Sequence, residues 1–142
     1  MPESSELRVI DSSVWIQVLR RGSSYAQLAR VEELLETDRA ATVPVIRVEL
    51  LQGAKDEPEY NRLRGRLDLL PTIEVTETVW EQAEKLAFLL RRRGLSPAIG
   101  DLLIAAATMS AGAGLVHADS DFDTIARHSR LRVESFVRAT AR

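Results

Sequence analysis

The chain has 142 residues, 45% of them hydrophobic and 28% charged, which is typical of one folded globular domain and not of a disordered chain. It has no cysteine, which excludes a disulfide framework and a thiolate metal site, and its formal net charge of -2 provides no overall basic field for nucleic acid. No apolar segment reaches transmembrane length and the first residues lack a secretion signal, so we expect a single cytoplasmic domain over residues 1–142, with residues 1–6 as a flexible tail.

Hydrophobic periodicity and turn residues predict alternating strands and helices along the first two thirds of the chain. Residues 7–11 have the composition of a strand that ends at Asp11, and Ser12 and Ser13 are favourable caps for a helix that ends before Gly22. The elements expected next are a helix over 24–38, a strand over 41–43, helices over 44–53 and 59–70, a short strand over 73–75 and a helix over 77–93.

The last third of the chain repeats this alternation. Ser96 and Pro97 are expected as the N-cap and first residue of a helix whose apolar, buried part covers 102–109. A strand over 115–117, a short helix over 124–128 with Asp123 as its cap, and a last strand over 131–135 follow. The alternation predicts an α/β fold with a mainly parallel sheet of four to five strands between helices.

Four carboxylates occupy positions that these elements would bring to one end of the sheet. Asp11 and Asp119 follow strands, whereas Glu49 and Asp101 stand about one turn into helices and have apolar neighbours. Each has an ordinary explanation, as a turn former or as an acid favoured by the helix dipole. Those explanations do not account for all four meeting beyond the carboxyl ends of the strands, which is where open α/β sheets bind ligands.

Converging carboxylates without cysteine or a suitable histidine pair favour a hard cation, Mg²⁺ or Mn²⁺. Such a cation activates water and stabilises charge on a phosphoryl oxygen, which fits phosphodiester hydrolysis. The seventeen arginines, against two lysines, include groups at 20–21, 62–66 and 91–93. Arginine suits phosphate because its planar guanidinium donates two parallel hydrogen bonds, but a solvated helix surface is the interpretation that we favour for these groups, since charge runs usually lie on such surfaces.

Four segments of the chain together resemble the PIN-domain ribonucleases, and most closely the VapC-type toxins of bacterial toxin–antitoxin pairs. They surround the four acids, and they cover residues 9–15, 48–54, 100–106 and 115–122. The resemblance implies a PIN-like α/β/α sandwich and a Mg²⁺- or Mn²⁺-dependent endoribonuclease that cuts tRNA or rRNA. It also implies that the catalytic acids are Asp11, Glu49, Asp101 and Asp119.

The same resemblance implies roles for neighbouring residues. Asp121 is expected to join Asp11, Asp101 and Asp119 as an accessory metal ligand. Ser13 would orient a carboxylate or a water behind the site, although a helix cap explains this serine equally well.

Two histidines and a run of three arginines are interpreted as well. His117 stands where many members of the family carry threonine, and we interpret it as a buried strand-end histidine without a catalytic role. His128 lies in a polar segment and is expected at the surface. Arg91, Arg92 and Arg93 are predicted to position the RNA backbone at the rim of the site.

A cognate VapB-type antitoxin with a basic side chain directed at the acids is the partner that the resemblance implies. It also suggests a homodimer, for which the helix after Asp11 (Val14, Trp15, Val18, Leu19) and the helix around residues 25–35 offer apolar surface, unless these residues belong to the core. Two alternatives remain open. One is a receiver-like phosphoacceptor domain, which the lack of a late lysine disfavours; the other is a PIN-like binding module without catalysis.

Overall fold

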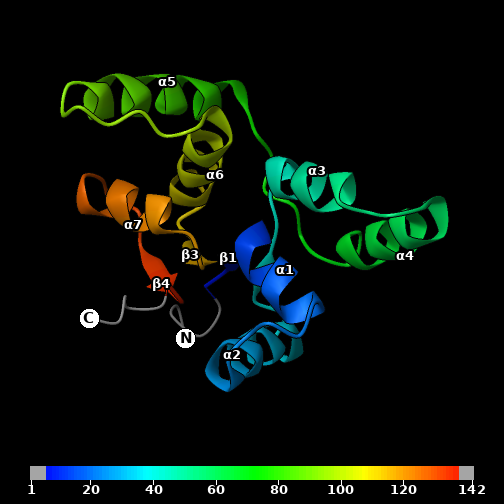
Figure 1. Cartoon of the computed structure of the whole chain (residues 1–142). Coiled ribbons are helices and arrows are strands. Elements are labelled where there is room, and N and C mark those ends of the chain that lie inside the picture. The colour runs from blue at the N-terminus through cyan, green and yellow to red at the C-terminus, as the bar shows by residue number, and fades with distance from the viewer. Residues whose placement is uncertain (1–5, 138–142) are drawn as a thin grey trace.

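The computed structural model describes residues 6–137 and contains a four-stranded sheet in which every neighbouring pair of strands is parallel (Figure 1). The strands lie in the order β2-β1-β3-β4. This confirms the predicted α/β fold with a mainly parallel sheet, which has four of the four to five strands expected. The strands are β1 (Arg8–Ile10), β2 (Ala40–Ala41), β3 (Gly114–His117) and β4 (Val133–Ser135).

Seven helices connect and cover these strands within residues 6–137. Five of them begin at side-chain caps, where a side-chain oxygen accepts a backbone N–H of the first turn; the capping residues are Asp11, Ser24, Asp56, Thr76 and Asp119. The helices are α1 (Ser12–Leu19), α2 (Tyr25–Glu36), α3 (Pro44–Gln52), α4 (Glu57–Leu67), α5 (Glu77–Arg91), α6 (Ile99–Ser110) and α7 (Ser120–Arg127).

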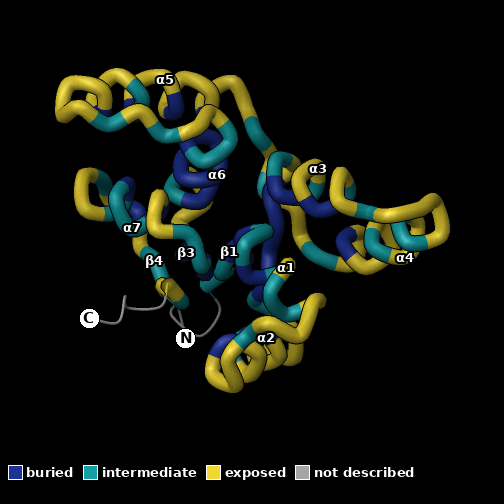
Figure 2. Tube along the Cα trace, viewed as in Figure 1, coloured by how far each residue is buried: buried dark blue, intermediate teal, exposed yellow. Residues whose placement is uncertain are grey.

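The two faces of the sheet support two separate hydrophobic clusters, because successive strand side chains point to opposite faces. Val9, Ala41 and Leu115 belong to the larger cluster, which includes the buried residues of α5, α6 and α7. Ile10 and Val116 belong to the smaller cluster with residues of α1 and α2. Figure 2 shows the resulting layers, with most of α6 and of the central strands β1 and β3 buried, β4 more exposed, and the outer helices exposed on one side. Over residues 6–137, none of the helices combines the length and the apolar character needed to cross a bilayer.

The short strand predicted over residues 73–75 is wrong. Thr72 forms only an isolated parallel bridge with Thr42, through Thr42 N–H to the Pro71 carbonyl (3.0 Å) and Ile73 N–H to the Thr42 carbonyl (2.8 Å). The chain then leaves the edge of β2 and enters α5. Two hydrogen bonds hold this segment against the sheet, but the pairing does not continue into a fifth strand.

The predicted starts of three helices are also wrong. Asp11, not Ser12 or Ser13, caps α1, and Asp119, not Asp123, caps an α7 that begins at Ser120. The helix expected from Ser96 and Pro97 begins at Ile99, and the Ser96 hydroxyl instead accepts a hydrogen bond from Arg91. Of the predicted tail, residues 1–5 lie outside the described part of the chain, and Glu6 is ion-paired with Arg8 and Arg132.

The sheet order places a crossover point between β1 and β3. After β1 the chain moves to one side to form β2, and β3 then returns to the other side of β1. In open α/β sheets the crevice at such a point, beyond the carboxyl ends of the strands, is where ligands bind. Asp11 follows β1 and Asp119 lies two residues after β3, so both are anchored at this crevice.

Candidate active site

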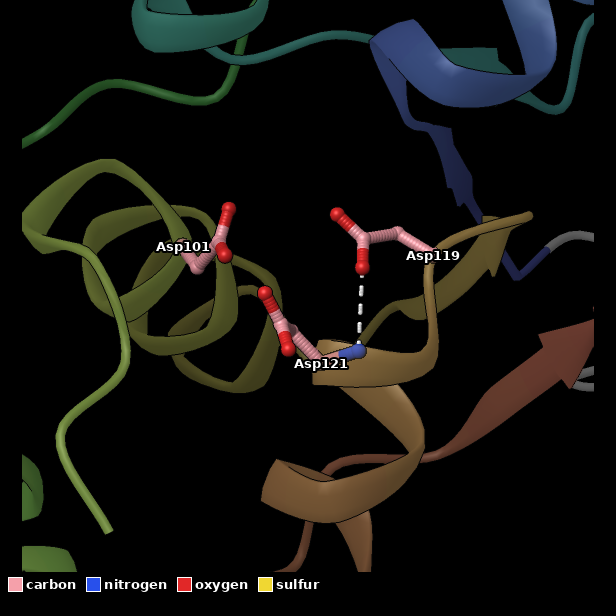
Figure 3. A group of neighbouring side chains, drawn as sticks. All are labelled: Asp101, Asp119 and Asp121. Atoms are coloured by element: carbon pink, nitrogen blue, oxygen red, sulfur yellow. Dashed lines mark hydrogen bonds between the residues drawn. The ribbon is translucent and has the colours of Figure 1, made fainter.

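Three aspartates from the starts of two helices meet beyond the end of β3. Asp101 lies in the first turn of α6, Asp119 caps α7, and Asp121 lies in the first turn of α7. One carboxylate oxygen of each lies within 4.8 Å of the others. Figure 3 shows the three side chains directed toward a shared space, with the Asp121 N–H donating to Asp119 Oδ1 at 3.0 Å. The Oδ2 atom of Asp119 is left without a protein donor among residues 6–137.

Asp11 is the most buried of the acids, with 3% of its surface exposed. Its Oδ2 atom accepts the Ser13 N–H at 3.1 Å and the Ser13 hydroxyl at 2.6 Å. Burial raises the pKa of Asp11, and the hydrogen bonds from Ser13 oppose that shift. Asp11 lies outside the group of three aspartates, but its charge and that of Asp119 repel each other.

Glu49 reaches the same region from α3. The Ser12 hydroxyl donates to its Oε1 atom at 3.0 Å, which connects the start of α1 to α3. Gly100, next to Asp101, lies close by, since a Cβ atom at this position would be 3.9 Å from Glu49 Oε2 and 3.4 Å from Val45 Cγ1. Desolvation, followed by the charges of Asp11 and Asp119, raises the pKa of Glu49.

The electrostatics of the cluster are those of like charges held together. Partial burial and then repulsion from Asp119, Asp11, Asp121 and Glu49 raise the pKa of Asp101 to about 7, from an ordinary value of 3.8. None of the five acids forms an ion pair with a basic side chain of residues 6–137. An all-oxygen donor set with uncompensated negative charge fits a divalent hard cation.

Ser13 links the two halves of the site. Besides donating to Asp11, its Oγ atom accepts the backbone N–H of Ala118 at 2.9 Å. The loop after β3 is thereby tied to the first turn of α1. Of the two interpretations of Ser13, its hydroxyl makes the contacts expected of a residue that orients a carboxylate, while Asp11 supplies the helix cap.

His117, Asp123 and Ser12 have contacts at the site that the sequence did not indicate. His117 is fully buried and its Nδ1 atom accepts the Asp119 N–H at 3.1 Å, while its Nε2 atom lies 3.1 Å from Asp123 Oδ1. Burial lowers the pKa of His117, against the attraction of Asp123. A histidine two residues before an acid and six before another is a weak signal, because only the fold brings the three groups together. His128 is exposed, as predicted.

Arg91, Arg92 and Arg93 are exposed at the C-terminal end of α5 and the turn that follows, which Figure 1 places at the outer edge of the molecule. Arg91 donates to Ser96 and the Arg92 guanidinium lies 5.7 Å from the centre of the Phe88 ring. These contacts are local, so the predicted RNA contact of the three arginines stays a prediction.

A family model of the PIN domain matches residues 8–128. Ribonuclease VapC11 of Mycobacterium tuberculosis is 36% identical over 132 residues, which cover 90% of this chain and 98% of that protein. Ribonuclease VapC51 of the same organism is 36% identical over 110 residues, covering 77% of this chain and 80% of that protein.

Two solved structures extend the likeness of the fold. VapBC2 from Rickettsia felis, bound to a DNA fragment from its promoter, matches with a TM-score of 0.73 at 19% identity, over 92% of this chain and 98% of that chain. VapC20 of Mycobacterium tuberculosis, a toxin that cleaves the sarcin–ricin loop, matches with a TM-score of 0.60 at 18% identity, over 82% of this chain and 93% of that chain.

Proposed function

This chain belongs to the PIN-domain family as a VapC-type endoribonuclease of a toxin–antitoxin system, and we propose that it hydrolyses RNA with Mg²⁺ or Mn²⁺ held by its acidic cluster. One observation carries the proposal. Three aspartate oxygens lie within 4.8 Å of one another, with Asp11 and Glu49 close enough to raise the pKa of Asp101, and no basic side chain of the described residues neutralises them.

Asp101, Asp119 and Asp121 would hold the cation, with Asp11 as the further ligand. When bound, the cation supplies the positive charge that activates a water and stabilises the phosphoryl oxygens of the scissile bond. Asp11 is fixed at Oδ2 by Ser13, so its Oδ1 atom is the one left to face the site. Asp119 is similarly fixed at Oδ1 by the Asp121 N–H, which leaves its Oδ2 atom to bind the cation.

Glu49 is the acid that we assign to accept the proton of the attacking water. It is more exposed than Asp11, and Ser12 holds its Oε1 atom while Oε2 faces the first turn of α6. Its raised pKa favours this role, because a base works best when its pKa approaches the working pH.

RNA is the proposed substrate, and the sequence leaves tRNA and rRNA open. Arg91, Arg92 and Arg93 remain the proposed contacts to its backbone, since exposed guanidinium groups bind phosphate without reading sequence. The VapC20 toxin is described as cleaving the sarcin–ricin loop, which makes an rRNA fragment containing that loop a suitable first substrate.

A VapB-type antitoxin is the proposed partner, and a cytoplasmic location follows from that pairing. The acids, which lack a cationic partner within residues 6–137, would attract a basic antitoxin side chain. A homodimer is proposed as well. Val14 belongs to the core, whereas Leu19, Leu28 and Leu35 are exposed around an apolar cavity of about 360 Å³ between α1, α2 and α4.

The test is cleavage of total RNA by protein purified free of antitoxin, with Mn²⁺, with Mg²⁺ and with EDTA. We expect cuts only with metal, and an Asp11→Asn variant at least about 100-fold slower, the usual range for loss of an acid–base or metal-binding group. Glu81→Gln, an exposed acid of α5, is the matched control and should cut at the wild-type rate.

Equal RNA patterns for wild type and Asp11→Asn would favour the alternative of a PIN-like binding module without catalysis. The receiver-like alternative is disfavoured by the PIN-domain match, and phosphorylation by acetyl phosphate, detected by intact mass, would restore it.

A further inference from the structure

His117, the last residue of β3, is a fully buried polar side chain that has no role in the reaction proposed above. Both of its ring nitrogens nevertheless face polar groups of the loop and helix that carry Asp119 and Asp121. Nδ1 accepts the Asp119 N–H at 3.1 Å, and Nε2 lies 3.1 Å from Asp123 Oδ1, although the ring N–H is not well aligned with that oxygen. The Phe122 ring packs at a centroid distance of 5.4 Å.

We propose that His117 is a positioning residue, which holds the Asp119 amide and thereby sets where the Asp119 carboxylate meets Asp101 and Asp121. The proposal rests on the function proposed above, since it concerns the geometry of the same acids. His117 is too buried to touch RNA, so it would act only through Asp119.

The loop after β3 is held at two consecutive amides by side chains. The Ala118 N–H donates to Ser13 Oγ at 2.9 Å, and the Asp119 N–H donates to His117 Nδ1. Asp119 is also fixed at its other end, where Oδ1 accepts the Asp121 N–H. A residue held at its amide and at one carboxylate oxygen presents the second oxygen in one direction, which is what a metal ligand requires.

The surroundings of Nε2 bear on which tautomer of His117 is present, because only a ring without a proton on Nδ1 can accept the Asp119 N–H. Because Nδ1 accepts a hydrogen bond, the ring proton must be on Nε2, on the side of Asp123. Asp123 Oδ2 accepts the Ser135 hydroxyl at 3.0 Å, and Ser135 is the β4 neighbour of His117 in the sheet. Ser135 thus holds the Asp123 carboxylate beside Nε2, and the charge of that carboxylate, without an aligned hydrogen bond, favours the tautomer in which Nδ1 is free to accept.

The first test reads this hydrogen bond in the metal-free wild type by NMR. We expect a scalar coupling across the bond between the Asp119 amide nitrogen and His117 Nδ1, together with nitrogen shifts of a ring protonated at Nε2. A ring protonated at Nδ1, or an Asp119 amide without the coupling, would overturn the proposal. This measurement depends neither on bound metal nor on the folding of a variant.

The second test compares His117→Leu, which removes the acceptor at similar volume, with His117→Asn, whose Oδ1 atom can replace Nδ1. We expect His117→Leu to bind Mn²⁺ about 10- to 100-fold more weakly by calorimetry, the usual range for such supporting residues, and to lose kcat with KM for RNA unchanged. His117→Asn should recover most of the affinity.

The matched control is Thr108→Val, which removes another fully buried polar group, one whose hydroxyl donates to the Ile104 carbonyl inside α6. It should lower Tm without changing Mn²⁺ affinity. Wild-type Mn²⁺ affinity in His117→Leu, or no recovery in a folded His117→Asn, would overturn the positioning role. Failure of the wild type itself to bind Mn²⁺ would instead overturn the function proposed above.

Discussion

The Oγ atom of Ser13 donates to Asp11 Oδ2 at 2.6 Å, a shorter hydrogen bond than the 3.0 Å bonds that Glu49 and Asp119 accept. Ser13 Oγ also accepts the Ala118 N–H, so one hydroxyl joins the first turn of α1 to the loop after β3. Asp11 directly precedes that turn and Asp119 lies in that loop, so the acids that follow two neighbouring strands are linked. The geometry of the site therefore depends on a group that has no charge of its own.

Replacing Ser13 with alanine is expected to lower kcat by about 10-fold or more, because residues that orient metal-binding carboxylates commonly have effects of that size. Stability should fall by about 1–2 kcal/mol, since the Ala118 N–H loses its acceptor. Cleavage rates and urea unfolding measure the two effects. Ser13→Thr keeps the hydroxyl and should retain activity, whereas Ser110→Ala, at the exposed end of α6, should change neither quantity. Wild-type kcat in Ser13→Ala would contradict the orienting role.

Mn²⁺ is expected to stabilise the protein, because it relieves the repulsion among the acids. At a free concentration of 100 times Kd the gain is about 2.7 kcal/mol, which corresponds to a rise in Tm of several degrees for a domain of this size. Differential scanning fluorimetry with and without EDTA measures it. Asp119→Asn should abolish the rise and Glu81→Gln should keep it. A wild-type Tm that does not respond to millimolar Mn²⁺ would count against the site.

The pKa of Asp101 predicts how the metal-free protein responds to pH. Its value is about 7 in the folded protein and near 3.8 when unfolded, so between these limits the folded state keeps a proton that the unfolded state has released. The contribution is therefore most favourable below pH 4, is lost as the pH rises to 7, and changes no further above that.

The free energy of unfolding of Asp101→Asn in EDTA should consequently match that of the wild type near pH 4 and exceed it at pH 8. We expect a difference of about 1–2 kcal/mol, after allowing for the partial exposure of this group. Urea unfolding across this pH range measures the difference. With saturating Mn²⁺ the order should reverse, because only the wild type gains from the metal. A wild type more stable than Asp101→Asn at pH 8 in EDTA would contradict the assignment.

The acids could be located from the sequence because each follows a strand or lies within the first two turns of a helix, and the carboxyl ends of parallel strands meet at one edge. The residues that hold the acids in place could not be predicted in this way. Ser12 and Glu49 are 37 positions apart, and Ser13 and Ala118 are 105 positions apart, so only the assembled sheet brings them together. The serines looked like helix caps because their residue type is common there.

The wrong predictions of helix caps had a different cause, because two nearby residues of suitable type competed for the same capping position. Asp11 and Asp119 cap their helices and leave Ser13 and Asp123 free for tertiary contacts. The segment over 73–75 has strand-forming residues, yet it makes only two hydrogen bonds to the edge of β2. Propensity alone does not distinguish a strand from a chain that only touches a sheet edge.

A network of charges away from the acids is expected to serve stability alone. The carboxylate of Glu134 in β4 accepts hydrogen bonds from Arg8 Nε and Arg30 Nε, each at 2.8 Å. This network lies beside the amino-terminal ends of β1 and β3. The hydrogen bond from Arg30 is the main reason that the pKa of Glu134 is lowered. A lowered pKa contributes stability that is present above the unfolded value of 4.5 and is lost as the pH falls through the folded value.

Glu134→Gln should therefore lower the free energy of unfolding by about 1 kcal/mol at pH 7, since the group is partly exposed and both arginines lose a charged partner. The difference from the wild type should shrink as the pH falls below 4.5. RNA cleavage should stay at the wild-type rate, because the network lies at the opposite ends of the strands from Asp11 and Asp119. Urea unfolding from pH 3 to 8, paired with cleavage assays, measures both, with Glu36→Gln as an exposed control. A loss of cleavage in a fully folded Glu134→Gln would show that this edge of the sheet also controls the site.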